Sequence, residues 1–306
     1  MSGFLAVGNM SIDDLVFADG TTMWHTPGGN AIYAALGMAV WGARPAVLAV
    51  HGEDYPVAML ADRIDLSPAR RHRVTLRNWG LYEEDGTRQF IFRHDTRDWI
   101  EFCPDVADLH GVTAAFCHLA PLPFGRQVAL ARAARAGGAR LLSVDPDDRE
   151  IRHVDAAALA ALLDMIDAFL PSRQEMRALF PGSGPVAALR RLRRLAPRTP
   201  VIGVKCGAEG VLLHLAAAAE LVMLPSVVAV AVDATGAGDA FCGGFLVGLA
   251  RTADPVMAAA MGSVSAAFAV GAVGTTALVG ASLAQAETML AALLPRITRK
   301  TFLATD

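Results

Sequence analysis

Two carboxylates flank a turn with almost no side chains in the stretch VDATGAGDAFCGGF, which begins at Val232. The apolar run 227–232 before the turn predicts a strand, and the small-residue run 236–250 after it predicts a helix. Because the first turn of a helix carries unpaired N–H groups and a partial positive charge, bare glycines there leave room for an anion. The turn therefore predicts an anion hole suited to phosphate, built from Gly236, Ala237 and Gly238.

Asp239 stands in the first turn of this predicted helix, beside the anion hole. A carboxylate next to a phosphate costs electrostatic repulsion, which a catalytic role would explain. The helix N-terminus would keep it ionised, and it could then accept the proton of an attacking hydroxyl group. The alternative is that Asp239 only caps its helix. The residue alone leaves both interpretations open.

The run D-A-T-G-A-G-D-A-F resembles the C-terminal signature of the ribokinase-like (PfkB) carbohydrate kinase family at every fixed position. The chain lacks a GxxxxGK[ST] loop, and Phe241 occupies the third glycine position of a dinucleotide fingerprint. The resemblance implies phosphorylation by ATP and Mg²⁺ of a hydroxymethyl group on a sugar or nucleoside-like substrate, with Asp239 as general base. Two alternatives remain: a hydroxymethylpyrimidine or pyridoxal kinase, and a non-catalytic sugar-sensing relative.

The N-terminal part of the chain carries further matches, on the substrate side. The stretch VGNMSIDDLV resembles the family's first strand, whose terminal Asp holds sugar hydroxyl groups; spacing from Gly8 indicates Asp13, with Asp14 as the alternative. The stretch PGGNAIYAALG is similar to the family's Gly-Gly signature, in which the backbone approaches the substrate closely. The substrate-binding residues that the resemblance implies are Asp13, Gly28, Gly29, Asn30 and Asp233.

The later matches lie on the nucleotide side. The stretch PSRQEM falls where the family has Asn-x-x-Glu, so Glu175 would organise Mg²⁺ through water, with Ser172 in place of Asn. The stretch VKCGAEG resembles a turn that lines the nucleotide phosphates, and AVGAVGTTAL resembles a loop beside the adenine. The nucleotide-site residues implied are Ser172, Glu175, Lys205, Gly207, Gly210 and Gly274. In some members a K⁺ ion binds nearby; its ligands here would be Asp233, Thr235, Ala269, Ala272 and Gly274.

A further motif, DPDDR, resembles the D-P-N-x-R stretch of the sugar-acid and fructose branches of the family. Asp147 replaces the usual Asn, which argues against membership of those branches. Arg149 has two interpretations, a phosphate contact or a surface ion pair.

The elements that must position these residues alternate along most of the chain. The expected buried strands are 4–9, 44–50, 114–121, 139–146, 167–172 and 200–207. The expected helices are 29–41, 55–65, 124–137, 155–165, 173–180 and 185–196. The alternation predicts an α/β fold with a mainly parallel sheet covered on both faces, which the resemblance identifies as the ribokinase-like three-layer sandwich. Such sheets bind ligands at the carboxyl ends of their strands.

Three hairpins break this alternation. Residues 210–215 and 220–225 predict an antiparallel extension of the main sheet. A hairpin over 15–25 would turn at Asp19-Gly20, and another over 79–95 at Asp85-Gly86. The latter two predict a small antiparallel sheet, which the resemblance implies is a lid over the substrate, formed by about 15–25 and 79–101. The lid mediates a dimer in some relatives, so a homodimer through the lid is expected.

Length and composition favour one well-packed domain over residues 1–306, with 54% hydrophobic and 19% charged residues. The formal net charge of −3 gives no general attraction to nucleic acid or anionic membranes, so the expected partners are small molecules. The uncharged stretch 255–286 is rich in Ala and Gly and predicts a buried helix followed by a loop, not a membrane span. Four scattered cysteines and an N-terminus without a basic start favour the reducing cytoplasm.

Overall fold

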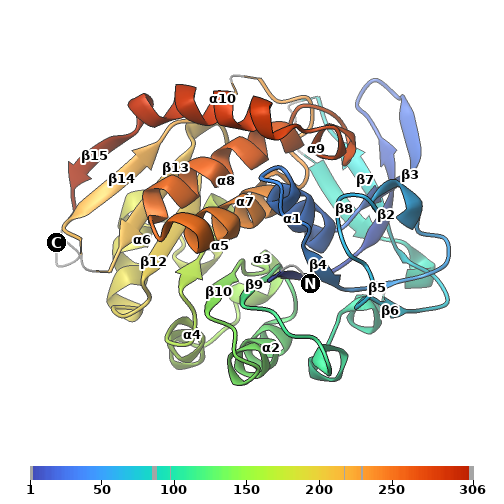
Figure 1. Ribbon diagram of the computed structural model, residues 1–306, viewed down its shortest axis with the longest axis horizontal. Coiled ribbons are helices and arrows are strands. Elements are labelled where there is room, and N and C mark those ends of the chain that lie inside the picture. The colour runs from blue at the N-terminus through green and yellow to red at the C-terminus, as the bar shows by residue number, and fades with distance from the viewer. Residues whose placement is uncertain (1–2, 85–87, 97, 217, 229, 303–306) are drawn as a thin grey trace.

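A large sheet runs through the centre of the molecule, with helices on both faces (Figure 1). The computed structural model describes residues 3–84, 88–96, 98–216, 218–228 and 230–302. The order of strands across this sheet is β15 (Thr298–Thr301), β14 (Glu220–Leu224), β13 (Val211–Leu215), β12 (Val201–Lys205), β11 (Ala168–Phe169), β10 (Leu141–Val144), β9 (Phe116–Leu119), β1 (Phe4–Val7) and β4 (Ala46–Leu48).

The strands from β12 to β4 are parallel, whereas β13, β14 and β15 continue the sheet in antiparallel fashion. Successive side chains of a strand pack into hydrophobic cores on opposite faces of the sheet. In β1, Leu5 and Val7 pack on one face and Ala6 packs on the other. Both faces are therefore covered, which explains the unbroken apolar runs. The α/β prediction is confirmed, and β15 is an addition that the sequence did not indicate.

The helices form two layers. One layer contains α1 (Asn30–Ala39), α7 (Ala237–Thr252), α8 (Pro255–Ala269), α9 (Thr276–Val279) and α10 (Leu283–Leu293). The other contains α2 (Phe124–Ala136), α3 (Asp148–Ile151), α4 (Ala156–Leu163), α5 (Arg173–Leu179) and α6 (Pro185–Leu195). Among the residues described, no helix is long and apolar enough to cross a membrane.

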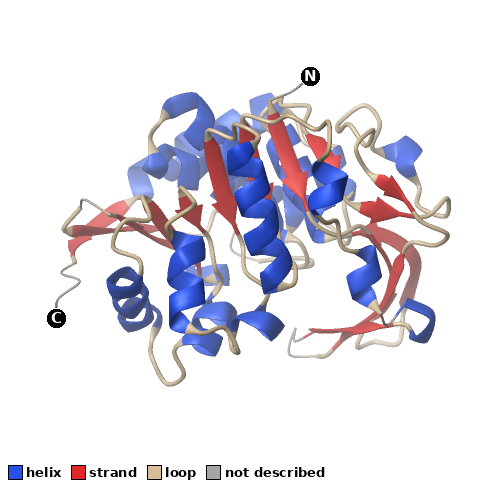
Figure 2. Cartoon of the chain, turned by 90° about the horizontal axis from the view of Figure 1, so that it is seen from below, coloured by secondary structure: helices blue, strands red, loops and turns tan. Residues whose placement is uncertain are grey.

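A smaller sheet stands at the end of the molecule away from the C-terminus (Figure 2). It consists, in order, of β3 (Thr22–Gly28), β2 (Ser11–Val16), β7 (Leu76–Tyr82) and β8 (Arg88–Phe92). The pairs β2–β3 and β7–β8 are the predicted antiparallel hairpins, and β2 joins them by running parallel to β7. The predicted turn at Asp85-Gly86 lies outside the described residues. We call this small sheet the lid.

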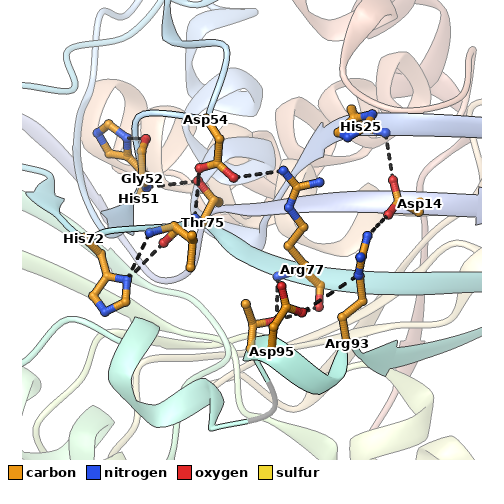
Figure 3. A network of polar contacts seen from close by, with 12 residues as sticks. Asp14, His25, His51, Gly52, Asp54, His72, Thr75, Arg77, Arg93 and Asp95 are labelled. Atoms are coloured by element: carbon orange, nitrogen blue, oxygen red, sulfur yellow. Dashed lines mark hydrogen bonds and ion pairs between the residues drawn. The ribbon is translucent and has the colours of Figure 1, made fainter.

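A polar network braces the start of β7 against the turn that follows β5 (Val50–His51), which itself pairs with β6 (Arg70–Arg71) (Figure 3). The Asp54 carboxylate accepts hydrogen bonds from the backbone N–H and hydroxyl of Thr75, at 2.9 and 2.7 Å, and pairs with Arg77 at 2.9 Å. The Thr75 hydroxyl in turn accepts from the N–H of Gly52. The turn thus anchors one end of the lid.

Two predicted elements are absent from the described residues. Over 55–65 there is only a 3₁₀ turn, Val57–Met59, because Asp65 pairs through its backbone with Pro45 and Val47, which a continuous helix would prevent. The strand predicted over 227–232 is not formed by the residues described there, 227–228 and 230–232, and Val230 and Val232 are 85% and 68% exposed. The sheet edge beside β14 is already occupied by β15, so this run has no strand to pair with.

Candidate active site

Asp13 lies on the face of β2 that looks toward the turn between β3 and α1. Its Oδ1 accepts a hydrogen bond from Asn78 Nδ2 on β7 at 2.8 Å. A Cβ placed on Gly28 would lie 2.6 Å from Asp13 Oδ2, so the glycine leaves room for this carboxylate. Burial raises the pKa of Asp13 to about 6, and the charge of Asp233 adds to the effect.

Asp14, the alternative candidate, has a different environment from Asp13. Its carboxylate accepts from the His25 N–H at 2.9 Å and pairs with Arg93 at 2.6 Å on the outer face of the lid (Figure 3). Neighbouring side chains of a strand point to opposite faces. Asp14 therefore fastens the lid strands together, and Asp13 is the carboxylate on the inner face.

The turn before α1 is built for close backbone contact. Gly29 has φ +108°, and a Cβ there would lie 2.3 Å from the Asn9 carbonyl oxygen. The Asn30 side chain accepts from the Asn9 N–H and donates to the Pro121 carbonyl, each at 2.7 Å. Both ends of the Asn30 amide therefore hold loops of the protein together, and only its remaining hydrogen-bonding capacity is available to a substrate.

The glycine turn before α7 has the form that the sequence predicted. Gly236 adopts φ +72° at the N-cap, and no side chain caps the first turn of the helix. A Cβ on Gly236 would lie 2.1 Å from the Tyr33 ring, so the turn is pressed against α1. Asp239 follows in the first turn, where burial and Glu175 raise its pKa to about 7, although Lys205 and Arg88 oppose that rise.

Lys205, the last residue of β12, extends to the start of α7. Its ammonium group pairs with Asp145 and lies 3.6 Å from Cys242 Sγ. A Cβ on Gly238 would be 3.2 Å from Lys205 Nζ, so the charge is adjacent to the glycine turn before α7. The ion pair holds the pKa of Lys205 above its usual value even though burial works against the charged form.

The residues around Asp145 fit a hydrated Mg²⁺ ion. Asp145 Oδ1 is buried and has no hydrogen-bond partner among the described residues, and burial raises the pKa of this carboxyl. The charges of Glu175 and Asp239 add to that rise. Glu175 also forms a capping box with Ser172 at the start of α5. Magnesium prefers carboxylate oxygens and retains waters, which matches one unused oxygen beside a second carboxylate.

A cavity of about 320 Å³ opens beside the glycine turn before α7. It collects Ser172, Lys205, Gly207, Gly210, Ala237 and Gly238, which the sequence had placed at the nucleotide or the anion hole. Its remaining lining is mostly apolar and includes Val227, Phe241, Ala266 and Val270. Gly274 does not line it; a Cβ there would instead meet Thr26 of the lid at 2.8 Å.

The loops predicted to hold K⁺ lie side by side. The Val232 N–H donates to the Val270 carbonyl at 2.8 Å, and buried Asp233 accepts from the Thr235 N–H at 2.9 Å. The buried hydroxyl groups of Thr26 and Thr275, near Gly274, have no partner among the described residues. Polar atoms without partners at this junction fit a bound cation.

Arg149 forms the ion pair that was one of its two interpretations. Its Nε and Nη2 donate to the Asp147 carboxylate at 3.1 and 2.7 Å. The guanidinium also lies over the rings of Trp99 and Phe92, with 4.6 and 5.2 Å to their centroids. The pair thus ties the lid to the loop after β10.

Sequence reasoning missed several residues at the site. Asp145 could have been found, because it lies at the carboxyl end of the buried strand predicted over 139–146. Asn78 was hidden because the parallel pairing of β2 with β7 sets its position. Tyr82 was expected among the lid aromatics, but its contact with the glycine turn was not; its hydroxyl lies 3.0 Å from Thr235 Oγ1. Arg88 was likewise not anticipated in the lining of the cavity.

Comparisons with known proteins agree with this geometry. A cytidine kinase of Thermococcus kodakarensis is 26% identical over 260 residues, covering 82% of this chain and 90% of that protein. The structure of a Methanocaldococcus jannaschii nucleoside kinase superposes with a TM-score of 0.76 at 18% identity, covering 95% of this chain and 99% of that one. A Vibrio cholerae fructokinase with bound fructose, ADP and calcium gives a TM-score of 0.75 at 18% identity, covering 94% and 98%.

The model of the pfkB family of carbohydrate kinases matches residues 5–280, which is most of the chain. The fold, a three-layer sandwich with a lid, is that of the ribokinase-family structures above. The chain therefore belongs to the pfkB family of carbohydrate kinases and is a phosphotransferase with an alcohol group as acceptor.

Proposed function

We propose that this kinase transfers the γ-phosphoryl group of ATP to a hydroxymethyl group on a sugar or nucleoside. One observation carries the proposal: the loop from Asp233 to Asp239 borders both halves of the site. Asp233 is close enough to Asp13 to raise its pKa, whereas Ala237 and Gly238 line the 320 Å³ cavity. An acceptor held by Asp13 and a nucleotide in that cavity would meet at Asp239.

Each side chain has a definite role in this reaction. Asp13, steadied by Asn78, accepts hydrogen bonds from two adjacent hydroxyl groups of the acceptor. Asp239 takes the proton of the attacking hydroxyl group. The unpaired amides at the start of α7, together with Lys205, stabilise the negative charge that develops on the transferred group. Mg²⁺ held near Asp145 and Glu175 would neutralise charge on the nucleotide.

The two alternatives are weaker. A hydroxymethylpyrimidine or pyridoxal kinase would share the glycine turn, but the lid sheet and the pairing of Asp13 with the Gly-Gly turn favour a polyol acceptor. A non-catalytic sensor has no need for a general base in the anion hole, and Asp239 is present there. A panel of nucleosides, sugars and pyridoxal, assayed by ADP release, distinguishes the three.

The test of the central role is Asp239→Asn, which keeps the size of the side chain and removes the base. We expect turnover to fall by about 10²- to 10⁴-fold, the usual scale for loss of a general base. Asp254→Asn makes the same change at the exposed start of α8 and should leave turnover unaltered, since Asn also caps helices well. Near-normal turnover of Asp239→Asn, with substrate still bound, would contradict the mechanism.

We also propose a K⁺ site between the 232–235 and 269–274 loops, supported by their backbone contact and by the Thr26 and Thr275 hydroxyl groups, which have no partner among the described residues.

For the assembly of the protein, we propose a homodimer through the outer face of the lid. That face carries Trp24 and Ile91, which are 54% and 46% exposed. Trp24 packs edge-on against Trp79, which lies opposite Ile91 in the strand register.

A further inference from the structure

Arg88 is the first residue of β8 and pairs across the hairpin with Tyr82, the last residue of β7. Its side chain is among those that line the 320 Å³ cavity, together with Lys205 and Gly238. All other described lining residues lie between 172 and 270, outside the lid. The lid therefore contributes one cation to a cavity that the rest of the protein builds.

Among the residues that the structure describes, the Arg88 guanidinium has no hydrogen-bond or ion-pair partner, although the residue is half-buried. Two other lid arginines contrast with it: Arg77 pairs with Asp54 at 2.9 Å, and Arg93 pairs with Asp14 at 2.6 Å. An unpaired, partly desolvated cation is costly unless a bound anion supplies the missing partner.

In this structure, the end of the lid that carries Arg88 is in contact with the glycine turn that precedes Asp239. The Tyr82 hydroxyl, 3.0 Å from Thr235 Oγ1, holds this end of the lid on the glycine turn. Three charged side chains act on Asp239: Lys205 from β12, Glu175 from α5 and Arg88 from the lid. Arg88 lowers the pKa of Asp239, as expected of a cation close to that carboxylate.

We propose that Arg88 contacts the γ-phosphoryl group while it is being transferred, so that the closed lid supplies part of the catalytic charge. This inference rests on the proposed function. In the transfer, the acceptor oxygen forms a bond to the γ-phosphorus, and the bond from that phosphorus to the β–γ bridging oxygen breaks. The bond electrons leave with ADP, and the hydroxyl proton passes to Asp239. Negative charge grows on the oxygens within reach of a planar, bidentate guanidinium donor.

A contact of Arg88 with the γ-phosphoryl group would also limit the hydrolysis of ATP when no acceptor is bound. Lys205 and the amides of α7 belong to the rest of the protein and are present whether or not the lid is closed. Arg88 arrives only with the lid, so full charge stabilisation requires the position in which the lid also covers the acceptor. Water, which cannot hold the lid closed, would then be a poor acceptor.

The test compares Arg88→Gln with Gln89→Ala, a neighbour whose side chain lies on the opposite face of the same strand. With an acceptor that the wild-type enzyme phosphorylates, kcat of Arg88→Gln should fall by about 10³-fold, the lower end for arginines that contact a transferred phosphoryl group. KM for the acceptor should change by less than about threefold, since Arg88 is remote from Asp13. Gln89→Ala should match the wild type, and added guanidinium ion should restore part of the lost rate.

A second measurement needs no acceptor. Calorimetry on the full chain with Mg²⁺ compares ADP alone with ADP plus aluminium fluoride, a mimic of the transferring phosphoryl group. Arg88→Gln should weaken binding of the mimic by about 10²-fold or more and leave ADP affinity within about threefold. An equal loss for both probes, or unchanged kcat in an active enzyme, would overturn the role of Arg88. If the wild type transfers no phosphoryl group to any acceptor, the proposed function fails instead.

Discussion

Asp13 and Asp14 are neighbours in the sequence but have separate roles, because a strand directs successive side chains to opposite faces. Asp14 pairs with Arg93, whereas Asp13 has only the neutral side chains of Asn78 and Ser11 as described hydrogen-bond partners and lies near a second carboxylate, Asp233. Its ionised form is therefore costly until hydroxyl groups of an acceptor donate to it. Burial likewise raises the pKa of Asp239 in the first turn of α7, although the charges of Lys205 and Arg88 oppose that rise.

The raised pKa values of these two carboxyl groups predict the acid limb of the activity profile. Both groups act in their ionised forms, and a raised pKa means that each keeps its proton up to a higher pH. We expect kcat/KM to be constant above about pH 8, to fall tenfold per unit below the pKa of Asp239, about 7, and to fall more steeply below that of Asp13, about 6. Asp13→Asn should remove only the steeper part. A profile that is flat from pH 5 to 7 would contradict both assignments.

At the scale of elements, glycines set how closely α1 and α7 pack. A Cβ on Gly243 would lie 1.9 Å from the Ala34 carbonyl oxygen, and one on Gly37 would lie 2.2 Å from that of Ala240. Both helices begin at glycine turns of the site, Gly29 and Gly236. The distance between the two turns, and so between acceptor and phosphate, depends on helices that touch through their backbones.

Gly243→Ala should therefore disturb both stability and activity. Overpacking of this kind costs about 1–3 kcal/mol, and here the obstacle is backbone, which cannot rotate away. Gly125→Ala in α2 is the matched control: nothing lies within 4 Å of its Cβ, and alanine should stabilise that helix by about 0.5–1 kcal/mol. Urea unfolding measures both effects. A Gly243→Ala protein as stable and active as the wild type would show that α1 and α7 can separate freely.

Elements could be predicted from the sequence where the burial pattern and the local residue types indicate the same structure. The prediction failed where the pairing of strands that are distant in the sequence determines the structure. The buried parallel strands and the glycine turn before α7 were recovered because both faces of the strands are covered and few residues fit the turn. The 227–232 run looked like a strand, but it lies beyond an edge that β15 occupies. Asn78 and Arg88 enter the site only through lid pairing, which no local pattern reveals.

At the scale of the whole molecule, the outer face of the lid predicts self-association. Exposed apolar groups gathered on one sheet face usually mark an interface. We expect analytical ultracentrifugation to show a dimer that the double change Trp24→Ser and Ile91→Ser weakens by about tenfold or more. Met59→Ser alters another exposed apolar side chain, 41% exposed and away from the lid, and should have no effect. A wild-type protein that stays monomeric at high concentration would refute the dimer.

The covalent links between the lid and the large sheet all leave from the same end of the lid. β2 begins at Ser11 soon after β1, β3 ends at Gly28 beside it, and β7 begins at Leu76, opposite Ser11 in the register. Asp13 is two residues from this attached end, whereas Arg88 is at the free end. If the lid opens about its attached end, that end moves least. Asp13 would then keep its contact with the acceptor while Arg88 moves away from the nucleotide. If Asp13 and Arg88 act as we propose, this geometry predicts an order of events in which the alcohol is captured first and the charge arrives last.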